Sequence, residues 1–362
     1  MVAGATAVRV GLPAAEPILM IVVRAAVLED TDQLWDLIRQ ATYGMTTLQI
    51  TKEQLTERIE LSHFAFARKT ERPGSDLYVF VMEDLGKRKL VGTSCIFSKT
   101  GGYEPFYSYR RVIESSECAL LGTTKRIESL QLQKIHDGPT EIGSLFLLPE
   151  YRGHGRGRLL SLTRFIFMAR HPKRFSEDVI AEMRGQVEED GNCPFWEAIG
   201  RKFFDMDFPQ ADFLSTIDKR FIEDLMPRHP IYVCLLPESA QSVLSQVHPQ
   251  TRPALAMLQE EGFVIGDMVD IFDGGPIVHC KRDEISAVKR TVDVAVADIV
   301  ERVEGTETIL ASRTGGFRSM LGRVKIEEQG AVISETAALT LGLKQGDTLW
   351  LLDPHANHGT AA

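Results

Sequence analysis

The order of apolar and polar positions along the chain predicts alternating strands and helices. The segment MIVVRAAVLEDTDQLWDLIRQA, which begins at Met20, opens with a β-branched run and then places Leu34, Leu37 and Ile38 on one helical face. This pattern predicts a strand followed by an amphipathic helix, and TKEQLTERIELSHFAFAR predicts a second helix. LYVFVMEDLGKRKLVGTSCIF predicts a hairpin, because two β-rich runs flank a polar turn that contains Gly86.

The middle of the chain continues this alternation. TEIGSLFLLPEYR predicts an apolar strand that stops at Pro149, and GRLLSLTRFIFMARHP predicts the helix after it. DVIAEMRGQ predicts a short strand ending at Gly185, and CPFWEAIGRKFF predicts a helix that ends at Gly200 before an aromatic strand. RPALAMLQEEGFVIGDMVDIF repeats the helix, glycine and phenylalanine of that last segment. Either the chain contains a duplicated half, or two helices share a glycine C-cap.

These elements predict an α/β or α+β fold in which helices flank a mixed central sheet. We expect four parts: a loose tail at 1–19, a first half at 20–215, a second half at 216–284 and a small β-rich module at 285–362. The tail is apolar, but it lacks the basic start and continuous apolar core of a signal peptide. The module is expected because QGAVISETAALTLGLKQGDTLWLLDP alternates short β runs with a polar turn.

Composition narrows the functional classes. The 362 residues are 44% hydrophobic and 25% charged, as in ordinary globular proteins, and no apolar run approaches the ~20 residues of a membrane span. The net charge of −9 disfavours general binding to nucleic acids or membrane surfaces. The five cysteines are scattered without a C-x-x-C pair, so they predict reduced thiols in the cytoplasm, with neither disulfides nor a metal site.

The segment PEYRGHGRGRLLSL, residues 149–162, joins a strand to a helix with three glycines and three arginines. It is not a Walker loop, because G-K-[ST] is absent, and it fails G-x-G-x-x-G because Arg158 occupies the third glycine position. It matches R-x-x-G-x-G through Arg152, Gly155 and Gly157. Such glycines let backbone N–H groups approach a pyrophosphate, and a helix N-terminus adds further donors. The turn predicts an anion site, with a solvated loop as the alternative. The candidate pyrophosphate-binding residues are Arg152, Gly153, Gly155, Arg156 and Gly157.

An apolar strand that leads into this turn resembles the GNAT superfamily of N-acyltransferases. In that superfamily the strand holds the pantetheine arm of coenzyme A, and the turn holds its pyrophosphate. The resemblance implies that the first half, 20–215, binds acyl-coenzyme A and that Leu145, Phe146 and Leu147 lie along the pantetheine. Acyl-coenzyme A would be a co-substrate, and we expect no permanently bound cofactor or metal.

Longer stretches resemble the arginine N-succinyltransferase family over about residues 20–350. They are VIAEMRG, PFWEAIGRKFFDMDFPQADFL, LMPRHPIY, QVHPQTRPALAMLQEEGF and DIFDGGP. The resemblance implies transfer of succinyl from succinyl-CoA to the α-amine of arginine, at the entry to arginine catabolism. It also implies that Leu145 contacts succinyl-CoA and that His248, in the second half, is the proton donor. We expect direct attack in a ternary complex, because no cysteine stands in a recognisable nucleophile setting.

Other histidines compete for the catalytic role. From the residues alone, capping the turn before Pro249 is the stronger interpretation of His248, and the family resemblance reverses that order. His229 is a rival, although its flanking prolines favour a structural turn. His154, within the glycine turn, fits contact with phosphate better than reaction.

The acceptor is the part of the reaction that the sequence constrains least. The family's acidic segment after the hairpin is absent, because Gly92 is followed by TSCIFSKTGG, while Asp137 and Glu141 are kept. A cationic amino acid needs carboxylates around its guanidinium or ammonium group. Three alternatives therefore stay open: another amine such as ornithine, another acyl-CoA, or a non-catalytic subunit that binds coenzyme A. We expect small-molecule substrates, a homo- or hetero-oligomer, and no nucleic-acid or membrane partner.

Overall fold

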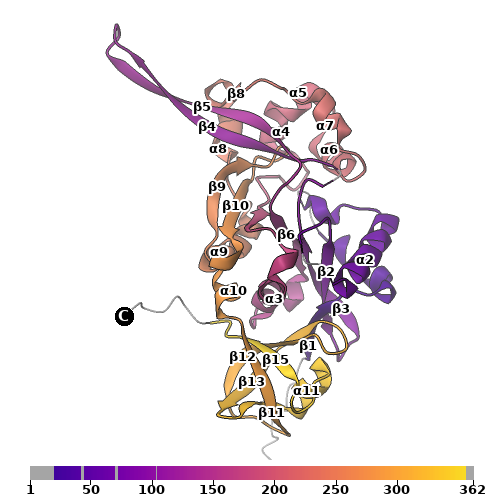
Figure 1. The fold of residues 1–362 in the computed structure, drawn as a ribbon. Helices are drawn as coiled ribbons and strands as arrows, with labels where there is room; N and C mark the ends of the chain where they lie inside the picture. The colour runs from indigo at the N-terminus through magenta and orange to yellow at the C-terminus, as the bar shows by residue number, and fades with distance from the viewer. Residues whose placement is uncertain (1–19, 42–44, 70–71, 103, 356–362) are drawn as a thin grey trace, which may run out of the picture.

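The structure is a computed structural model that describes residues 20–41, 45–69, 72–102 and 104–355, so the tail expected at 1–19 lies outside the described residues. The strands of this part form one continuous sheet, in the order β12-β15-β11-β14-β13-β1-β2-β3-β6-β7-β10-β9-β4-β5-β8. Helices lie along the sheet, and the mixed α/β architecture expected from the sequence is confirmed (Figure 1).

The bounds of the elements follow the chain. The strands are β1 (Ile21–Ala25), β2 (Leu77–Asp84), β3 (Lys89–Phe97), β4 (Phe106–Cys118), β5 (Thr123–Ile135), β6 (Thr140–Leu147), β7 (Asp178–Glu182), β8 (Ile231–Tyr232), β9 (Val264–Val269), β10 (Pro276–Lys281), β11 (Val292–Val300), β12 (Thr306–Ser312), β13 (Arg318–Glu327), β14 (Gly330–Ser334) and β15 (Thr348–Leu352). The helices are α1 (Thr31–Ile38), α2 (Lys52–Ala67), α3 (Arg156–Arg170), α4 (Pro194–Ala198), α5 (Gly200–Phe204), α6 (Phe208–Ser215), α7 (Arg220–Leu225), α8 (Glu238–Val243), α9 (Arg252–Glu260), α10 (Ser286–Arg290) and α11 (Glu335–Leu341).

The main hydrophobic core lies where the apolar periodicity predicted it. Leu34, Leu37 and Ile38 of α1 are buried against the strands, and β2 and β3 form the expected hairpin with its turn at 85–88. Helices α2 and α3 meet through Phe66 and Phe167, whose ring centroids are 5.1 Å apart. Burial of these aromatic and aliphatic side chains fixes α3 beside the central strands, because apolar area removed from water is the main stabilising contribution to a fold.

Strands β6 and β7 begin side by side and then part. Their parallel pairing is limited to Thr140 opposite Val179 and Glu141 opposite Ile180. Beyond that point Ser144 has a φ of +53°, and the register between β3 and β6 shifts beside it. A bulge of this kind bends a strand and re-aims its neighbours. The divergence opens a gap between the two strands in the middle of the sheet.

A long arm and a second core lie on the other side of this gap. Strands β4 and β5 pair along their whole lengths, and Figure 1 shows them projecting as a two-stranded arm beyond the body. The arm's tip exposes Leu120 and Leu121, whereas Tyr109 and Leu130 at its base are buried in a cluster with Trp196. The residue pattern at 106–135 did not predict this arm.

The C-terminal strands close on themselves, because β12 pairs with β13 as well as with β15. Together β11 to β15 enclose a hydrophobic cluster of their own, to which α11 contributes Ala337 and Leu341. The pairing of β1 with β13, in which Val23 lies opposite Ser319, joins them to the main sheet, and Ile309 and Leu352 also pack into the main core. The small β-rich C-terminal module expected from the sequence is confirmed, and its first strand begins at Val292.

Two expectations about residues 193–204 are wrong. Helix α4 ends at Ala198, and Gly200 then begins α5 instead of ending a helix before a strand. A Cβ at Gly200 would lie 2.1 Å from the Trp196 ring, so this glycine permits close packing. The segment at 252–272 does continue from α9 into β9. The two segments therefore have different local folds, so their shared helix, glycine and phenylalanine do not mark a repeated element.

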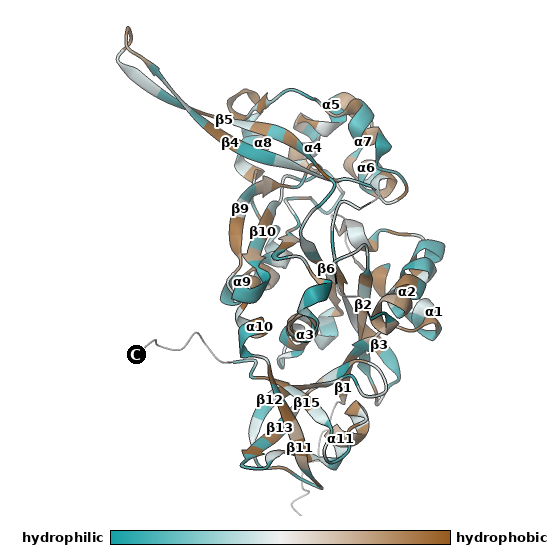
Figure 2. Ribbon diagram, in the orientation of Figure 1, coloured by the Kyte–Doolittle hydropathy of each residue, from teal (hydrophilic) through white to brown (hydrophobic). Residues whose placement is uncertain are grey.

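Hydropathy varies along the elements that border the gap. Figure 2 shows hydrophilic residues in the first turn of α3, although buried side chains make up most of the rest of that helix. Among the described residues, the helices lack the combination of length and apolar character that crossing a bilayer requires.

Candidate active site

The glycine turn connects β6 to α3 with a run of left-handed backbone. Gly153, His154 and Gly155 have φ angles of +96°, +50° and +71°. Glycine adopts this region without strain, which accounts for two of the three residues. Helix α3 begins at Arg156, and Gly157 lies in its first turn. Successive N–H groups in such a turn, together with a helix N-terminus, form a concavity suited to an anion.

A cavity of about 680 Å³ lies against this turn, and we name it the turn cleft. Its walls come from the end of β6, the glycine turn and the segment 250–257. The turn cleft brings together seven of the eight residues that the sequence suggested for coenzyme binding: Leu145, Phe146, Leu147, Arg152, Gly153, Gly155 and Gly157. A cavity of this volume matches those that hold cofactors and other small molecules.

The eighth residue, Arg156, does not line the turn cleft. Its guanidinium donates to the carbonyl oxygen of Tyr151 at 3.3 Å and lies over the Tyr151 ring. The neighbouring Arg158 lines the cleft but is held by an ion pair with Glu260. Arg152 is exposed, and its Nε donates to the Leu147 carbonyl at 3.3 Å. Arg152 is thus the guanidinium of the turn that lies on the cleft wall and reaches solvent.

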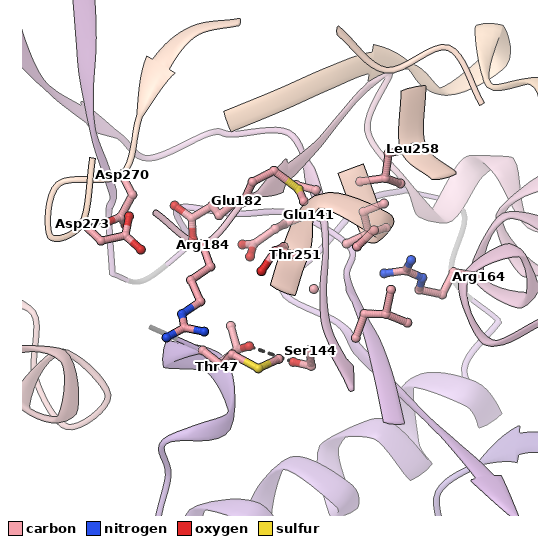
Figure 3. Close-up of a pocket in the computed structure, with 17 residues that line it drawn as sticks. Thr47, Glu141, Ser144, Arg164, Glu182, Arg184, Thr251, Leu258, Asp270 and Asp273 are labelled. Carbon is pink, nitrogen blue, oxygen red and sulfur yellow. Dashed lines mark hydrogen bonds between the residues drawn. The ribbon is translucent and has the colours of Figure 1, made fainter. Parts of the chain in front are cut away.

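The turn cleft adjoins a smaller space of about 130 Å³ in the gap between β6 and β7, which we name the central cavity. Both spaces are lined by Met45, Leu145, Arg184, Thr251 and Ala254. In Figure 3, Ser144 donates to the hydroxyl of Thr47 at 3.0 Å, which holds the strained Ser144 in place beside Leu145. The bulge of β6 therefore lies at the junction of the two spaces.

Charged side chains are concentrated on the walls of the central cavity. Figure 3 shows Glu141 and Glu182 near one another, with Asp270 and Asp273 to one side and Arg164 on the opposite side. Arg164 is fully buried, and this burial lowers its pKa to about 10. Its Nε and Nη2 donate to the Ser161 carbonyl and hydroxyl oxygens of the same helix. Arg164 is accordingly occupied by its own helix.

The two aspartates serve backbone turns. Asp273 accepts hydrogen bonds from the N–H groups of Gly185 and Gly275, at 2.7 and 2.8 Å. Asp270 accepts through Oδ1 from the N–H groups of Phe272 and of Asp273, at 2.7 and 2.8 Å. Burial is the main reason that the pKa of both carboxyls is raised. Asp273 uses both oxygens in this way, while Asp270 accepts both of these hydrogen bonds through Oδ1.

The two glutamates have a different environment. Within the described residues, no group donates a hydrogen bond to either carboxylate, although Glu141 is only 8% exposed. Glu182 is exposed to solvent and lines both the central cavity and another of the protein's cavities. Burial raises the pKa of both groups, and the charges of Glu141 and Asp270 raise that of Glu182 further. Unpaired carboxylates in such a place are poised to bind a positive group.

A third space of about 260 Å³, the side chamber, adjoins the central cavity on the side away from the glycine turn. The two share Thr47, Glu141, Glu182 and Asp270. Its other charged wall residues are Arg58, Lys99, Glu104 and Lys219. Arg58 donates to the Thr47 carbonyl at 2.6 Å, and Lys99 forms an ion pair with Asp137. The three spaces thus follow β6 in one line, from the turn to Glu141.

His248 lies beside this line but not on its walls. Its Nδ1 is 3.3 Å from Nη1 of Arg184, which lines both the turn cleft and the central cavity, and it accepts from the Gln250 N–H at 3.2 Å. Both partners are donors, so the neutral ring carries its proton on Nε2. Burial and then the Arg184 charge lower the pKa of His248. His229 and His154 are exposed and lie outside the walls of the three spaces.

The described cysteines do not form a nucleophile site. Cys95, Cys193 and Cys280 are buried, and burial raises the pKa of each thiol, which keeps it protonated. Cys118 and Cys234 are exposed on the arm and beyond β8. All five are free thiols, as the sequence predicted.

Sequence reasoning did not single out Glu182, Arg184 or Asp270 as site residues. The signal was present, because VIAEMRG and DIFDGGP place charges within or directly after apolar strands. Charge at the end of a buried strand is unusual unless a partner or ligand compensates it. Sequence alone did not show that these strands neighbour β6.

Comparison with known proteins gives a consistent assignment. Residues 21–287 match the family model described as arginine N-succinyltransferase beta subunit. Arginine N-succinyltransferase from Yersinia pseudotuberculosis is 37% identical over 341 residues, which are 91% of this chain and 97% of that protein. Arginine N-succinyltransferase subunit beta from Pseudomonas aeruginosa is 41% identical over 277 residues, covering 76% of this chain and 81% of that one.

A solved structure extends the similarity to three dimensions. The arginine/ornithine succinyltransferase subunit AI from Pseudomonas aeruginosa superposes with a TM-score of 0.85 at 32% identity, covering 93% of this chain and 99% of that one.

Proposed function

The chain belongs to the arginine N-succinyltransferase family, and on that premise we propose that it transfers succinyl from succinyl-CoA to the α-amino group of L-arginine. The observation that carries the proposal is the continuous line of spaces along β6. A large cleft at the glycine turn shares wall residues with the central cavity, which in turn shares Glu141, Glu182 and Asp270 with the side chamber. This arrangement suits an elongated, anionic acyl carrier that meets a cationic acceptor.

Coenzyme A would occupy the turn cleft. The N–H groups of the glycine turn and the first turn of α3 would hold its pyrophosphate, with Arg152 as an additional donor. The pantetheine arm would run along Leu147, Phe146 and Leu145 toward the central cavity. The thioester would then lie beside Leu145, where the bulge at Ser144 turns the backbone.

Transfer would proceed by direct attack of the amine on the thioester. The neutral α-amine forms the C–N bond, a backbone N–H of the bulged strand stabilises the oxyanion, and the C–S bond then breaks. The amine loses a proton and the departing thiolate gains one. We assign this proton transfer to His248, which Arg184 holds beside the cavities through Nδ1 and whose neutral state suits an exchange near neutral pH.

Ornithine is a second candidate acceptor, because the similar protein from Pseudomonas aeruginosa is an arginine/ornithine succinyltransferase subunit. A different acyl-CoA, or a subunit that binds coenzyme A without turnover, are further alternatives. The proposal also leaves the assembly of the chain with itself or with a second subunit as a prediction. A cytoplasmic location, inferred from the scattered free cysteines, is likewise a prediction.

One panel experiment separates these functions. Purified protein is mixed with succinyl-CoA or acetyl-CoA and with arginine, ornithine, lysine or glycine, and free thiol is followed with time. We expect thiol release with succinyl-CoA and arginine, and N2-succinylarginine as the product by mass spectrometry. Release with another pair would reassign the substrates, and coenzyme A binding without release for any pair would refute the enzyme.

A further inference from the structure

The carboxylates shared by the central cavity and the side chamber are those of Glu141, Glu182 and Asp270. They come from three separate elements: β6, the end of β7, and the turn between β9 and β10. The sheet order β6-β7-β10-β9 brings these segments together although more than a hundred residues separate the first from the last.

Nearby cations offset the charge of these carboxyls only in part. Glu141 is 8% exposed and lines both spaces. Its carboxylate receives no hydrogen bond from the described residues. Asp270 accepts hydrogen bonds from two backbone N–H groups, both through Oδ1. Lys219 on the chamber wall lowers the pKa of the three carboxyls through its charge, but burial outweighs it for each. Negative charge withdrawn from water without a partner is unfavourable until a cation enters.

An organic cation fits these walls better than a metal ion. Among the described residues, no three His, Cys, Asp or Glu side chains are grouped closely enough to hold a metal. The carboxylates are instead spread along a chamber of about 260 Å³ that also carries Arg58 and Lys219. A chamber with walls of both signs matches an amino acid, which brings a carboxylate as well as positive groups.

The positions of Leu145 and Glu141 along β6 determine where the α-amine of the acceptor and the end of its side chain would lie. Leu145 is at the junction with the turn cleft, and Glu141 is four residues earlier, at most about 13 Å away along the strand. The reacting α-amine must be near the thioester at the Leu145 end. The far end of the acceptor's side chain therefore lies toward Glu141 and the side chamber.

Resting on the proposed function, we propose that Glu141, Glu182 and Asp270 bind the guanidinium group of the acceptor and so select a cationic side chain. A planar guanidinium presents five N–H donors, enough for several carboxylates at once. The family's acidic segment that is missing after Gly92 is not needed for this, because these carboxylates come from outside 93–137. Asp137, which the sequence analysis considered, pairs with Lys99 instead.

The test compares arginine with citrulline, which has the same length but a neutral urea group. Wild-type protein should prefer arginine in kcat/KM for thiol release. Glu141→Gln and Glu182→Gln should each lower kcat/KM for arginine by about tenfold to a hundredfold through KM, with citrulline nearly unchanged. The KM for succinyl-CoA should stay constant. Asp178→Asn is the matched control, because this exposed carboxylate lies on the same strand β7 and pairs with Lys281 outside the cavities.

The outcomes separate the binding proposal from the proposed function. If both glutamine variants lose arginine and citrulline turnover equally, through kcat and with KM unchanged, the carboxylates act on the proton of the amine, and the guanidinium proposal is overturned. If wild-type protein turns over neither compound, calorimetry with arginine and citrulline still tests the chamber. Arginine binding that Glu182→Gln abolishes supports the proposal, and equal binding of both compounds refutes it. Retained affinity for coenzyme A identifies the variants that fold.

Discussion

The guanidinium of Arg184 lies 3.3 Å from Nδ1 of His248 and links that ring to the walls of both the turn cleft and the central cavity. Arginine can only donate, so Nδ1 is the acceptor and the ring proton lies on Nε2. A histidine that does not itself line the cavities is thereby oriented relative to them.

Replacing Arg184 should move the pH dependence of the reaction. Burial and the Arg184 charge hold the pKa of His248 below its ordinary value of 6.5. In Arg184→Met the charge is gone, so this pKa rises toward 6.5. If neutral His248 is the working form, activity is lost as the pH falls through that pKa, and the acid limb of kcat/KM moves to higher pH. Thiol release measured from about pH 5 to 8 checks this. An acid limb at the same pH in Arg184→Met, as expected for the control Arg201→Met, would contradict the coupling.

His248→Ala tests the catalytic role itself. We expect kcat to fall by about a hundredfold or more, which is the usual contribution of a positioned acid or base. The melting temperature should change little, because the ring is only partly buried. His229→Ala, at an exposed position outside the cavities, is the control and should keep full activity. Full turnover by a folded His248→Ala would remove this residue from the mechanism.

Gly157→Ala should affect stability and coenzyme binding in opposite directions. A Cβ at this position meets no atom within 4 Å, and alanine is favoured over glycine in a helix by about 0.5–1 kcal/mol. The same methyl group enters the turn cleft, where the backbone must approach a pyrophosphate. We expect an equal or higher melting temperature with about tenfold weaker binding of coenzyme A by calorimetry. Gly74→Ala, far from the turn in sequence, is the control, and unchanged affinity in Gly157→Ala would place the pyrophosphate elsewhere.

Glu182→Gln should stabilise the protein in a pH-dependent way. The pKa of Glu182 is raised well above 4.5, so the folded state holds this proton more tightly than the unfolded state. The wild-type free energy of unfolding therefore falls as the pH rises from about 4.5 through the folded-state pKa. Glutamine lacks this titration. We expect the variant to melt about 1–3 °C higher at pH 8, with a smaller difference at pH 4.5. A difference independent of pH would show that the pKa of Glu182 is not raised in the folded protein.

Replacing Asp273 should destabilise the protein, because its carboxylate accepts hydrogen bonds from backbone N–H groups. Asp273→Ala leaves the N–H groups of Gly185 and Gly275 without their acceptor, which costs about 1–3 kcal/mol of stability. Urea unfolding measures the loss. Asp283→Ala removes an exposed carboxylate that pairs with the adjacent Arg282 and should change stability by less than about 0.5 kcal/mol. Equal midpoints for the two variants would exclude the backbone role.

Local patterns predicted much of the fold. The first helix, the β2–β3 hairpin, and the strand that stops before Pro149 were all predicted from periodicity and turn residues, because local backbone preferences decide them. The end of the helix near Gly200 was predicted wrongly. There a close contact with the Trp196 ring, and not a helix cap, requires the glycine, and such a contact cannot be read from neighbouring residues.

The candidate site also has one part that local sequence predicted and one part that depends on long-range contacts. The glycine turn and Leu145 are contiguous in sequence, and motif spacing was enough to bring them together. Glu141, Glu182 and Asp270 are close only because β7 pairs with both β6 and β10. The order of strands in a sheet depends on contacts between residues far apart in the chain, and a single sequence predicts it poorly. The structure therefore adds the acidic end of the site, while the sequence already contained the coenzyme end.

The two ends of strand β6 would contribute to the binding of different substrates. Leu145 and Leu147 face the space proposed for the acyl carrier, and Glu141 faces the space proposed for the acceptor. Changes near residue 141 can thus alter which amine is used without disturbing the carrier, and changes after residue 145 can do the reverse. An insertion of one residue between them would turn Glu141 to the opposite face of the sheet. The length of this short stretch is consequently less free to change than the chemistry at either end.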